Sequence, residues 1–295
     1  MLNRLSCSAR HAVPRGAKSQ EKAQEKAQES AVAALDINAC VALIEDLTAI
    51  AAHAAAIIQQ CSAASLRHKV DGSPVTAADQ AAEAVILQDL ERLAPSIPVV
   101  SEERAAEGAA QFMAAQGAAY FLVDPLDGTR EFIAGRDEFT VNIALINFGT
   151  PVIGVIAAPA ADLAWRGIIG HGAERVRLTD RGAPTAIRTR PRPAEPVAMI
   201  SRSHLDAVTE AYLAGMPHAS AVNCGSSIKF CRVSEGSADL YPRLAPTHDW
   251  DVAAGHALVV AAGGDVRAAN GSPLVYGTPK RLIENFIARG DPRKS

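Results

Sequence analysis

The sequence predicts a mixed fold of the α+β or α/β class, in which helices pack on sheets. Three observations support this class: an amphipathic helical pattern near residue 40, short apolar strands between residues 98 and 157, and alternating strands and helices after residue 196. With 295 residues, of which 48% are hydrophobic, the chain can bury a large core in one or two domains. Residues 1–35 are set apart, because the repetitive run SQEKAQEKAQES is typical of a disordered extension.

Two helices open the predicted fold. Apolar residues recur at helical spacing through residues 36–61, and Asp36 is a suitable N-cap for this helix. After the turn-rich residues 69–74, Thr76 is placed to cap a second helix that reaches Leu93. Asp79 stands at the third position of that helix, which is the arrangement of a capping box.

Short apolar strands follow the helices. Residues 98–100 lead to Glu102, and residues 120–123 lead to Asp124, so two predicted strands end at acidic side chains. Residues 139–157 contain two more strands around a Phe-Gly-Thr-Pro turn, which predicts a β-hairpin.

The second half of the chain alternates between strands and helices. Residues 181–196 are rich in Arg, Pro and Thr and are the best candidate for a boundary. We therefore expect an N-terminal α+β half over residues 36–185 and a C-terminal α/β half over residues 186–295. The expected elements of the second half are a strand at residues 197–200 and helices near residue 205, over residues 226–234 and over residues 249–262.

Composition limits the classes of partner. The net charge of −3 gives no basic excess for a phosphate backbone, so nucleic acid is not expected as a partner. The five cysteines include no C-x-x-C pair and favour reduced thiols in a cytoplasmic protein. No stretch of eighteen apolar residues lacks charges or breakers, so no membrane span is expected. The basic residues near the start leave an N-terminal targeting segment, or peripheral attachment to an inner membrane, as alternatives.

The most informative string is the hexapeptide DPLDGT at residues 124–129, which directly follows a predicted strand. Two like charges about 4 Å apart repel by about 4 kcal/mol at an effective dielectric constant of about 20. A divalent cation removes this cost, and magnesium prefers the carboxylate and carbonyl oxygens that the hexapeptide offers. Gly128 allows the backbone to approach a ligand closely, and the N–H groups of Gly128 and Thr129 are suited to a phosphate.

Two alternatives compete with a metal site at the hexapeptide. A D-P-x-D-G segment is also good turn chemistry, so a capped surface turn is an alternative. Haloacid-dehalogenase-type phosphatases attack phosphorus with the first aspartate of a D-x-D-G-T motif, but here three positions separate the two aspartates. The extra residue reverses the alternation of side chains along a strand, which argues against a covalent aspartyl mechanism.

The sequence resembles the inositol-monophosphatase superfamily, whose signature is D-P-[IL]-D-G-T followed by W-D-x-A-A-G. The second part is present at residues 250–255, and the Glu102-Glu103 pair and the Thr76-x-x-Asp79 element also match. This resemblance covers residues 36–290. It implies the layered α-β-α-β-α sandwich of the inositol monophosphatases and sugar phosphatases, in which the N-terminal half (residues 36–185) binds metal and the C-terminal half (residues 186–295) completes the active site.

Within the superfamily, the sequence is most similar to the CysQ-type 3′(2′),5′-bisphosphate nucleotidases. The similarity lies in the strings at residues 69–76, 127–132, 201–204, 225–229 and 240–243. Inositol monophosphatases usually continue D-G-T with Thr-Asn-Phe, whereas this chain continues with Arg-Glu-Phe. That difference favours the nucleotidases.

The resemblance implies roles for individual residues. The implied metal ligands are Glu102, Asp124, Asp127, Asp251 and the carbonyl of Leu126, and the implied cofactor is Mg²⁺, as two or three ions. The implied catalytic residues are Asp79 and Thr129, which orient the attacking water, together with Glu102. The implied substrate contacts are Asp127, Gly128, Thr129, Arg130, Ser201, His204, Gly225, Lys229 and Asp251.

The activity implied by the resemblance is hydrolysis of adenosine 3′,5′-bisphosphate to AMP and phosphate by a metal-activated water. This lithium-sensitive reaction is a recycling step in sulfate assimilation, and the expected partner is a small phosphorylated nucleotide bound by a monomer or a homodimer. One alternative is an inositol 1-phosphate or sugar phosphatase that uses the same metal site. Another is a catalytically silent metal or nucleotide sensor, against which Asp79 and Thr129 argue because a pure binder has no need to activate water.

Overall fold

The computed structural model describes residues 37–61, 67–68, 74–104, 119–180, 182–216 and 218–291. The described residues belong to one compact unit that begins at Ile37. The predicted extension over residues 1–35, the Asp36 cap and most of the turn over residues 69–74 lie outside the described residues.

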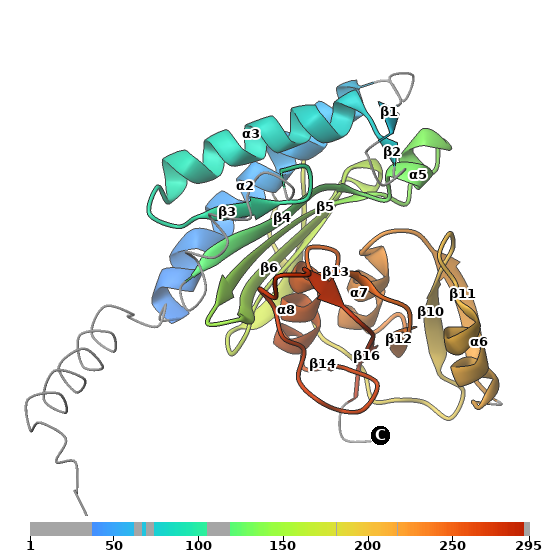
Figure 1. Ribbon diagram of the computed structural model, residues 1–295. Helices are drawn as coiled ribbons and strands as arrows, with labels where there is room; N and C mark the ends of the chain where they lie inside the picture. Colours follow the sequence, from blue (N-terminus) through green and yellow to red (C-terminus); the bar gives the residue numbers. More distant parts are fainter. Residues whose placement is uncertain are drawn as a thin grey trace, which may run out of the picture. The chain divides into compact units, whose positions relative to one another are not determined.

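Helices and sheets alternate in five layers (Figure 1). The first layer contains α2 (Ile37–Gln60) and α3 (Ala77–Leu93), which pack on each other and on a seven-stranded sheet. On the other side of that sheet lie α7 (Ile228–Ser234) and α8 (Ala253–Ala261), which also contact a five-stranded sheet. Outside the second sheet lies α6 (Ala207–Ala214). The expected α-β-α-β-α sandwich is confirmed.

The seven-stranded sheet has the order β3-β4-β5-β6-β7-β8-β9. Its strands are β3 (Val99–Ser101), β4 (Tyr120–Asp127), β5 (Thr140–Asn147), β6 (Thr150–Ala158), β7 (Leu163–Ile168), β8 (Gly172–Arg177) and β9 (Thr185–Ile187). Only β3 and β4 are parallel among these neighbours. The predicted hairpin is confirmed, because β5 and β6 pair through a turn at Phe148 and Gly149, and a short 3-10 turn, η1 (Pro159–Ala161), follows β6.

The five-stranded sheet has the order β11-β10-β12-β16-β14. Its strands are β10 (Val197–Ser201), β11 (Ser220–Cys224), β12 (Leu240–Arg243), β14 (Asp265–Arg267) and β16 (Phe286–Arg289). The parallel strands β10 and β11 are joined through α6, as a parallel connection requires. Two small pairs complete the strands: β1 (Arg67–His68) with β2 (Pro74–Val75), and β13 (Thr247–His248) with β15 (Leu282–Ile283).

The connection between the two sheets overlaps the Arg-, Pro- and Thr-rich stretch. β9 extends to Ile187, so the expected boundary between residues 185 and 186 falls inside that strand. Residues 188–196 then lead to β10. The division into a metal-binding half and a completing half stays a prediction.

Two elements that carry candidate site residues differ from the sequence prediction. β4 does not end before the hexapeptide but continues to Asp127, with a shift of register against β5 between Asp124 and Asp127. The irregular pairing lets the hexapeptide bend at the end of β4. α8 begins at Ala253 rather than at residue 249, so Asp251 lies in a turn just before the helix.

The helix α2 is the described helix that is long and apolar enough to cross a membrane, by length and composition only. Leu47, Ala51, Ala54 and Ile58 on it are fully buried in the core. A core helix passes the same test, and the expected absence of a membrane span stays a prediction.

Candidate active site

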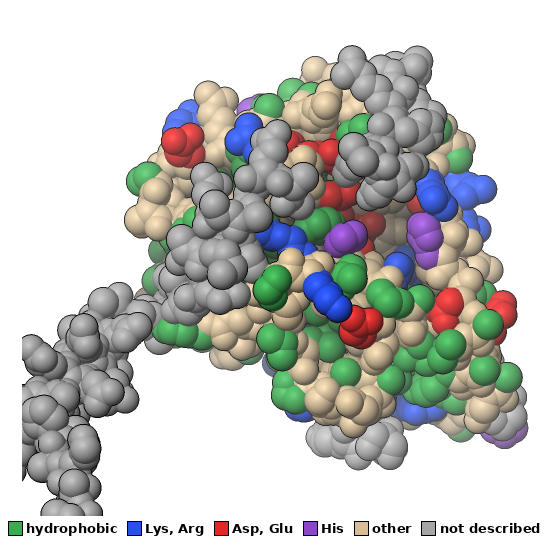
Figure 2. Space-filling model, viewed as in Figure 1, with side chains coloured by type: hydrophobic (Ala, Val, Ile, Leu, Met, Phe, Trp, Pro, Cys, Tyr) green, Lys and Arg blue, Asp and Glu red, His purple; other side chains and the backbone are tan. Residues whose placement is uncertain are grey.

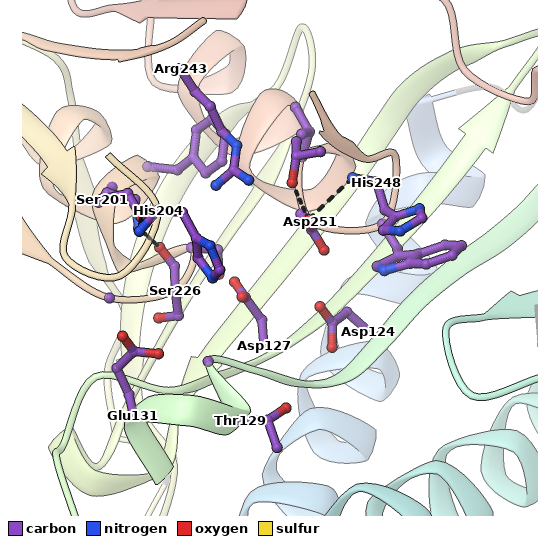
Figure 3. Close-up of a pocket in the computed structure, with 18 of the residues that line it drawn as sticks. Asp124, Asp127, Thr129, Glu131, Ser201, His204, Ser226, Arg243, His248 and Asp251 are labelled. Atoms are coloured by element: carbon purple, nitrogen blue, oxygen red, sulfur yellow. Dashed lines mark hydrogen bonds between the residues drawn. The ribbon is translucent and has the colours of Figure 1, made fainter. Parts of the chain in front are cut away.

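A pocket lies beside the hexapeptide (Figure 3). One side is formed by β4 and by α5 (Thr129–Ile133), and the other by α7, the loops after β10 and β11, and the end of β12. Every predicted site residue except Asp79 lines this pocket. On the surface, acidic side chains gather in a hollow with histidine and basic side chains around it (Figure 2).

Carboxylates from three separate segments converge in the pocket. Asp124 and Asp127 come from β4, Glu102 follows β3, and Asp251 precedes α8; the carboxylates of the three aspartates face one another in Figure 3. Burial raises the pKa of Asp124 well above its usual range, and the charges of Glu102, Asp127 and Asp251 raise it further. Burial, with the charge of Asp251, also raises the pKa of Asp127 to about 7. The pocket therefore concentrates negative charge that favours a bound cation.

Local hydrogen bonds orient these carboxylates. Asp124 Oδ1 accepts from the Leu126 N–H at 3.0 Å within the bent part of β4. Asp127 Oδ2 lies 3.4 Å from Asn142 Nδ2 on the neighbouring strand β5. Asp251 Oδ2 accepts from the Thr247 hydroxyl and, at 3.2 Å, from the His248 N–H. The aspartates are thus aimed into the pocket by their own backbone and by adjacent strands.

The donor types fit a hard divalent cation such as Mg²⁺. Four acidic residues and Leu126 line the pocket, and magnesium prefers carboxylate and carbonyl oxygens as ligands. In the described part of the chain, no three His, Cys, Asp or Glu side chains already stand close enough to enclose an ion. The fit therefore rests on the donor types and on the raised pKa values of Asp124 and Asp127, which a nearby cation would lower.

Asp79 lies behind the pocket but is connected to it through Thr129. The predicted capping box is confirmed: Asp79 Oδ2 accepts from the Thr76 N–H at 2.7 Å, and Thr76 Oγ1 accepts from the Ala78 N–H at 3.1 Å. The other oxygen, Asp79 Oδ1, accepts from the Thr129 hydroxyl at 3.1 Å. The same hydroxyl lies 3.1 Å from the Leu126 carbonyl, so Thr129 joins the buried Asp79 to the hexapeptide.

Two glycines allow the pocket walls to approach each other. Gly128 has a φ of +91°, and a Cβ there would lie 2.8 Å from the Glu138 carbonyl oxygen. A Cβ on Gly225 would lie 2.7 Å from the same oxygen. Side chains at either position would push the two walls apart.

The remaining predicted contacts lie on the wall opposite the carboxylates. Ser201 Oγ accepts from the His204 N–H at 3.1 Å, so this hydroxyl shapes the loop after β10. Lys229 is buried, and its Nζ donates to the carbonyls of Cys224, at 3.1 Å, and Ser226. Arg130 is exposed at the rim. Burial lowers the pKa of His204, and the nearby Arg243 lowers it further.

Several lining residues were not predicted as site residues. They include Glu131, Ser226, Ser227, Tyr241, Arg243 and His248. The Nε of Arg243 is buried and has no hydrogen-bond partner among the described residues, and Figure 3 shows the guanidinium directed toward the pocket. Arg243 stood in a string that resembles the nucleotidases, but a string does not reveal the direction of a side chain at a strand end.

Comparison with known proteins agrees with this geometry. Residues 40–292 match the sequence profile of the inositol monophosphatase family. The chain belongs to this family. As a member, it is 46% identical over 223 residues to the 3′(2′),5′-bisphosphate nucleotidase CysQ of Shigella flexneri, a match that covers 75% of this chain and 85% of that protein. Its identity to CysQ of Escherichia coli strain K12 is 45%, with the same coverage.

Solved structures give the same family fold. The crystal structure of CysQ from Bacteroides thetaiotaomicron matches with a TM-score of 0.73 and 34% identity, covering 88% of this chain and all of that one. An inositol monophosphatase from Anabaena matches with a TM-score of 0.67 and 25% identity, covering 85% of this chain and 92% of that one. This inositol monophosphatase family member is thus similar to both nucleotidases and inositol monophosphatases.

Proposed function

We propose that this family member is a Mg²⁺-dependent 3′(2′),5′-bisphosphate nucleotidase that hydrolyses adenosine 3′,5′-bisphosphate to AMP and phosphate. The observation that carries the proposal is a pocket with two chemically different walls. Carboxylates suited to a divalent cation face a wall that contains Lys229 and Arg243. A substrate with two phosphates can place one phosphate against each wall. The similarity to CysQ proteins at 45–46% identity supports this substrate class.

In this proposal the carboxylate wall holds the cofactor, as two or three Mg²⁺ ions. The ligands are Glu102, Asp124, Asp127, Asp251 and the Leu126 carbonyl. When bound, Mg²⁺ neutralises the phosphate and lowers the pKa of the attacking water.

The Thr129 hydroxyl donates a hydrogen bond to Asp79, so the Thr129 oxygen is able to accept a hydrogen bond from that water. Asp79 and Thr129 thereby orient the water in line with the phosphorus, as general base chemistry requires. The Gly128 and Thr129 N–H groups and Arg130 bind the scissile phosphate. Because water is the nucleophile, no covalent phosphoenzyme forms.

The opposite wall binds the rest of the nucleotide. Lys229 contributes a buried positive charge, and the guanidinium of Arg243, which lines the pocket, binds the second phosphate. Ser201, His204 and Gly225 shape the loops beside these cations. We also propose that the protein acts in sulfate assimilation, that it is cytoplasmic, and that it is a monomer or a homodimer.

A second candidate is an inositol 1-phosphate phosphatase, which the Anabaena structure favours because it shares this fold. The test is Mg²⁺-dependent phosphate release from adenosine 3′,5′-bisphosphate, inositol 1-phosphate and fructose 1,6-bisphosphate, each with and without Li⁺. Preference for the nucleotide, with inhibition by Li⁺, is the expected result. Preference for the inositol or sugar phosphate would keep the metal chemistry and overturn the substrate. Binding of Mg²⁺ and nucleotide without turnover would instead identify a sensor.

A further inference from the structure

Two acidic residues outside the metal cluster connect the walls of the pocket. Glu131 belongs to α5, and Glu138 precedes β5, so both lie on the side of the seven-stranded sheet. Glu131 Oε1 accepts from the hydroxyl of Ser203, in the loop after β10. Glu138 pairs with Arg202, which follows the same strand. Both carboxylates therefore hold loops of the five-stranded sheet from across the pocket.

Glu138 makes the larger set of contacts. Its Oε2 accepts from Arg202 Nε at 2.7 Å and from the Gly225 N–H at 2.8 Å, while its Oε1 accepts from Arg202 Nη2 at 2.6 Å. Arg202 Nη2 also donates to the Asn223 carbonyl at 3.1 Å. One carboxylate thus ties the loop after β10 to the end of β11. The hydrogen bonds from Arg202 hold the pKa of Glu138 below its usual range.

The backbone of Glu138 lies between the two walls. Its carbonyl oxygen is within 2.8 Å of the Cβ position of both Gly128 and Gly225. Gly128 belongs to the hexapeptide, and Gly225 begins the turn that leads to Lys229. Since there is no room for an extra carbon atom at either glycine, the spacing of the walls is set at this residue.

We propose that Glu138 is a positioning residue that holds the turn of residues 225–229 against the hexapeptide and so presets the distance between the two phosphate-binding walls. The identity of the ligand rests on the proposed function, but the contacts by which Glu138 connects the two walls do not. The Glu138 and Arg202 side chains are 25% and 35% exposed, and ion pairs with such exposure contribute little to global stability. Loss of Glu138 therefore acts on ligand binding and on local opening of the turn rather than on folding.

The test compares Glu138→Gln with a matched control, Asp162→Asn. Glutamine removes the negative charge and places an NH₂ group opposite one of the two Arg202 donors, so the paired contact with Arg202 is lost and the Gly225 N–H no longer has a charged acceptor. Asp162 makes the same kind of contacts elsewhere: it accepts from Arg177 Nε at 3.1 Å and Nη2 at 2.9 Å, and from the Thr179 N–H at 3.0 Å. It lies after η1 and does not line the pocket.

The first readout is hydrogen exchange of the Gly225 amide in the ligand-free protein. We expect exchange to quicken by about tenfold in Glu138→Gln and to stay unchanged in Asp162→Asn, because only the former removes the charged acceptor of the Gly225 N–H. Unchanged exchange of the Gly225 amide in Glu138→Gln would overturn the proposal that Glu138 holds this turn against the hexapeptide. This readout needs no substrate, so it decides the matter even if the wild-type protein does not hydrolyse the nucleotide.

The second readout separates positioning from a general structural role. In Glu138→Gln we expect the KM for adenosine 3′,5′-bisphosphate to rise about tenfold, while kcat/KM for p-nitrophenyl phosphate, which lacks a second phosphate, changes by less than about twofold. Equal losses on both substrates, with a lower melting temperature, would show that Glu138 serves only folding. Failure of the wild-type protein to turn over the nucleotide would overturn the proposed function alone.

Discussion

The hydroxyl of Thr129 donates to the carboxylate of Asp79 at 3.1 Å, although 50 positions separate the two residues in the chain. The other oxygen of Asp79 accepts from the N–H of Thr76 and completes the N-terminal cap of α3. One buried carboxylate therefore both starts a helix and orients the hydroxyl at the hexapeptide. The helix end holds Asp79 in a fixed position, which a water-orienting pair requires.

Asp79→Asn is expected to lower kcat by about 100-fold or more, because an amide neither carries the charge of Asp79 nor accepts a proton. The amide oxygen of asparagine can still accept the hydrogen bond from the Thr76 N–H, so the melting temperature should change little. Steady-state kinetics with adenosine 3′,5′-bisphosphate and thermal unfolding check both points. The control is Asp89→Asn on the same helix, where the carboxylate pairs with His53 and lies outside the pocket. A kcat close to that of Asp89→Asn would remove Asp79 from the mechanism.

Asp124→Asn is expected to raise the melting temperature without metal and to lower it with metal. In EDTA the variant should melt at a higher temperature than the wild type, because it removes a buried charge among like charges. In saturating Mg²⁺ the order should reverse, since a ligand at about 100 times its Kd stabilises the wild type by about 2.7 kcal/mol. Calorimetry in both buffers measures this. An Asp124→Asn protein that keeps the full Mg²⁺ shift would show that the ion binds elsewhere, and the exposed Asp180→Asn serves as the neutral control.

Arg243→Met is expected to raise the KM for adenosine 3′,5′-bisphosphate by about tenfold or more, because a charge-assisted hydrogen bond to the second phosphate is lost. The kcat/KM for p-nitrophenyl phosphate should stay within about threefold of the wild type, because this substrate lacks the second phosphate. Arg267→Met is the matched control, since Arg267 pairs with Asp265 away from the pocket. A similar loss on both substrates would place Arg243 at the scissile phosphate or in a structural role.

His256 is expected to make the protein sensitive to acid. Burial lowers the pKa of His256 from 6.5 to about 4, with Asp265 and Arg267 as opposing charged neighbours. Between these pH values the unfolded state binds the proton and the folded state does not, so stability falls as the pH drops through this window. The full loss in the free energy of unfolding is about 3 kcal/mol. Urea unfolding at pH 7.5, 5.5 and 4.5 should show a shallower fall for His256→Gln, and parallel curves would contradict this origin.

Local patterns in the sequence predicted much of the fold. The apolar spacing predicted α2, Thr76 and Asp79 predicted the start of α3, and the turn at Phe148 predicted the β5–β6 hairpin; each is confirmed. These elements are set by neighbours close in sequence. The candidate ligands, in contrast, come from segments far apart in sequence, and the family resemblance rather than any local pattern predicted that they share one site.

The strands β7 and β8 were not predicted, because charged residues interrupt their apolar pattern. Arg166 in β7 is only 2% exposed, yet it is paired with Glu45 of α2 and Glu174 of β8. A buried arginine is stable only with such partners, and its partners cannot be read from the strand itself.

Contacts across the pocket could not be predicted from the sequence either. Glu138 and Arg202 are 64 positions apart, and neither lies in the hexapeptide or in the W-D-x-A-A-G string. Their pairing depends on how two sheets meet, which the folded chain alone determines.

The most direct test of the central claim is the identity of the products formed from adenosine 3′,5′-bisphosphate by the purified protein in Mg²⁺ and in EDTA. The proposed nucleotidase activity predicts 5′-AMP and phosphate in Mg²⁺, and no reaction in EDTA. Formation of 3′-AMP would contradict the proposed reaction, and equal turnover in EDTA would contradict the assignment of the carboxylate wall to the metal.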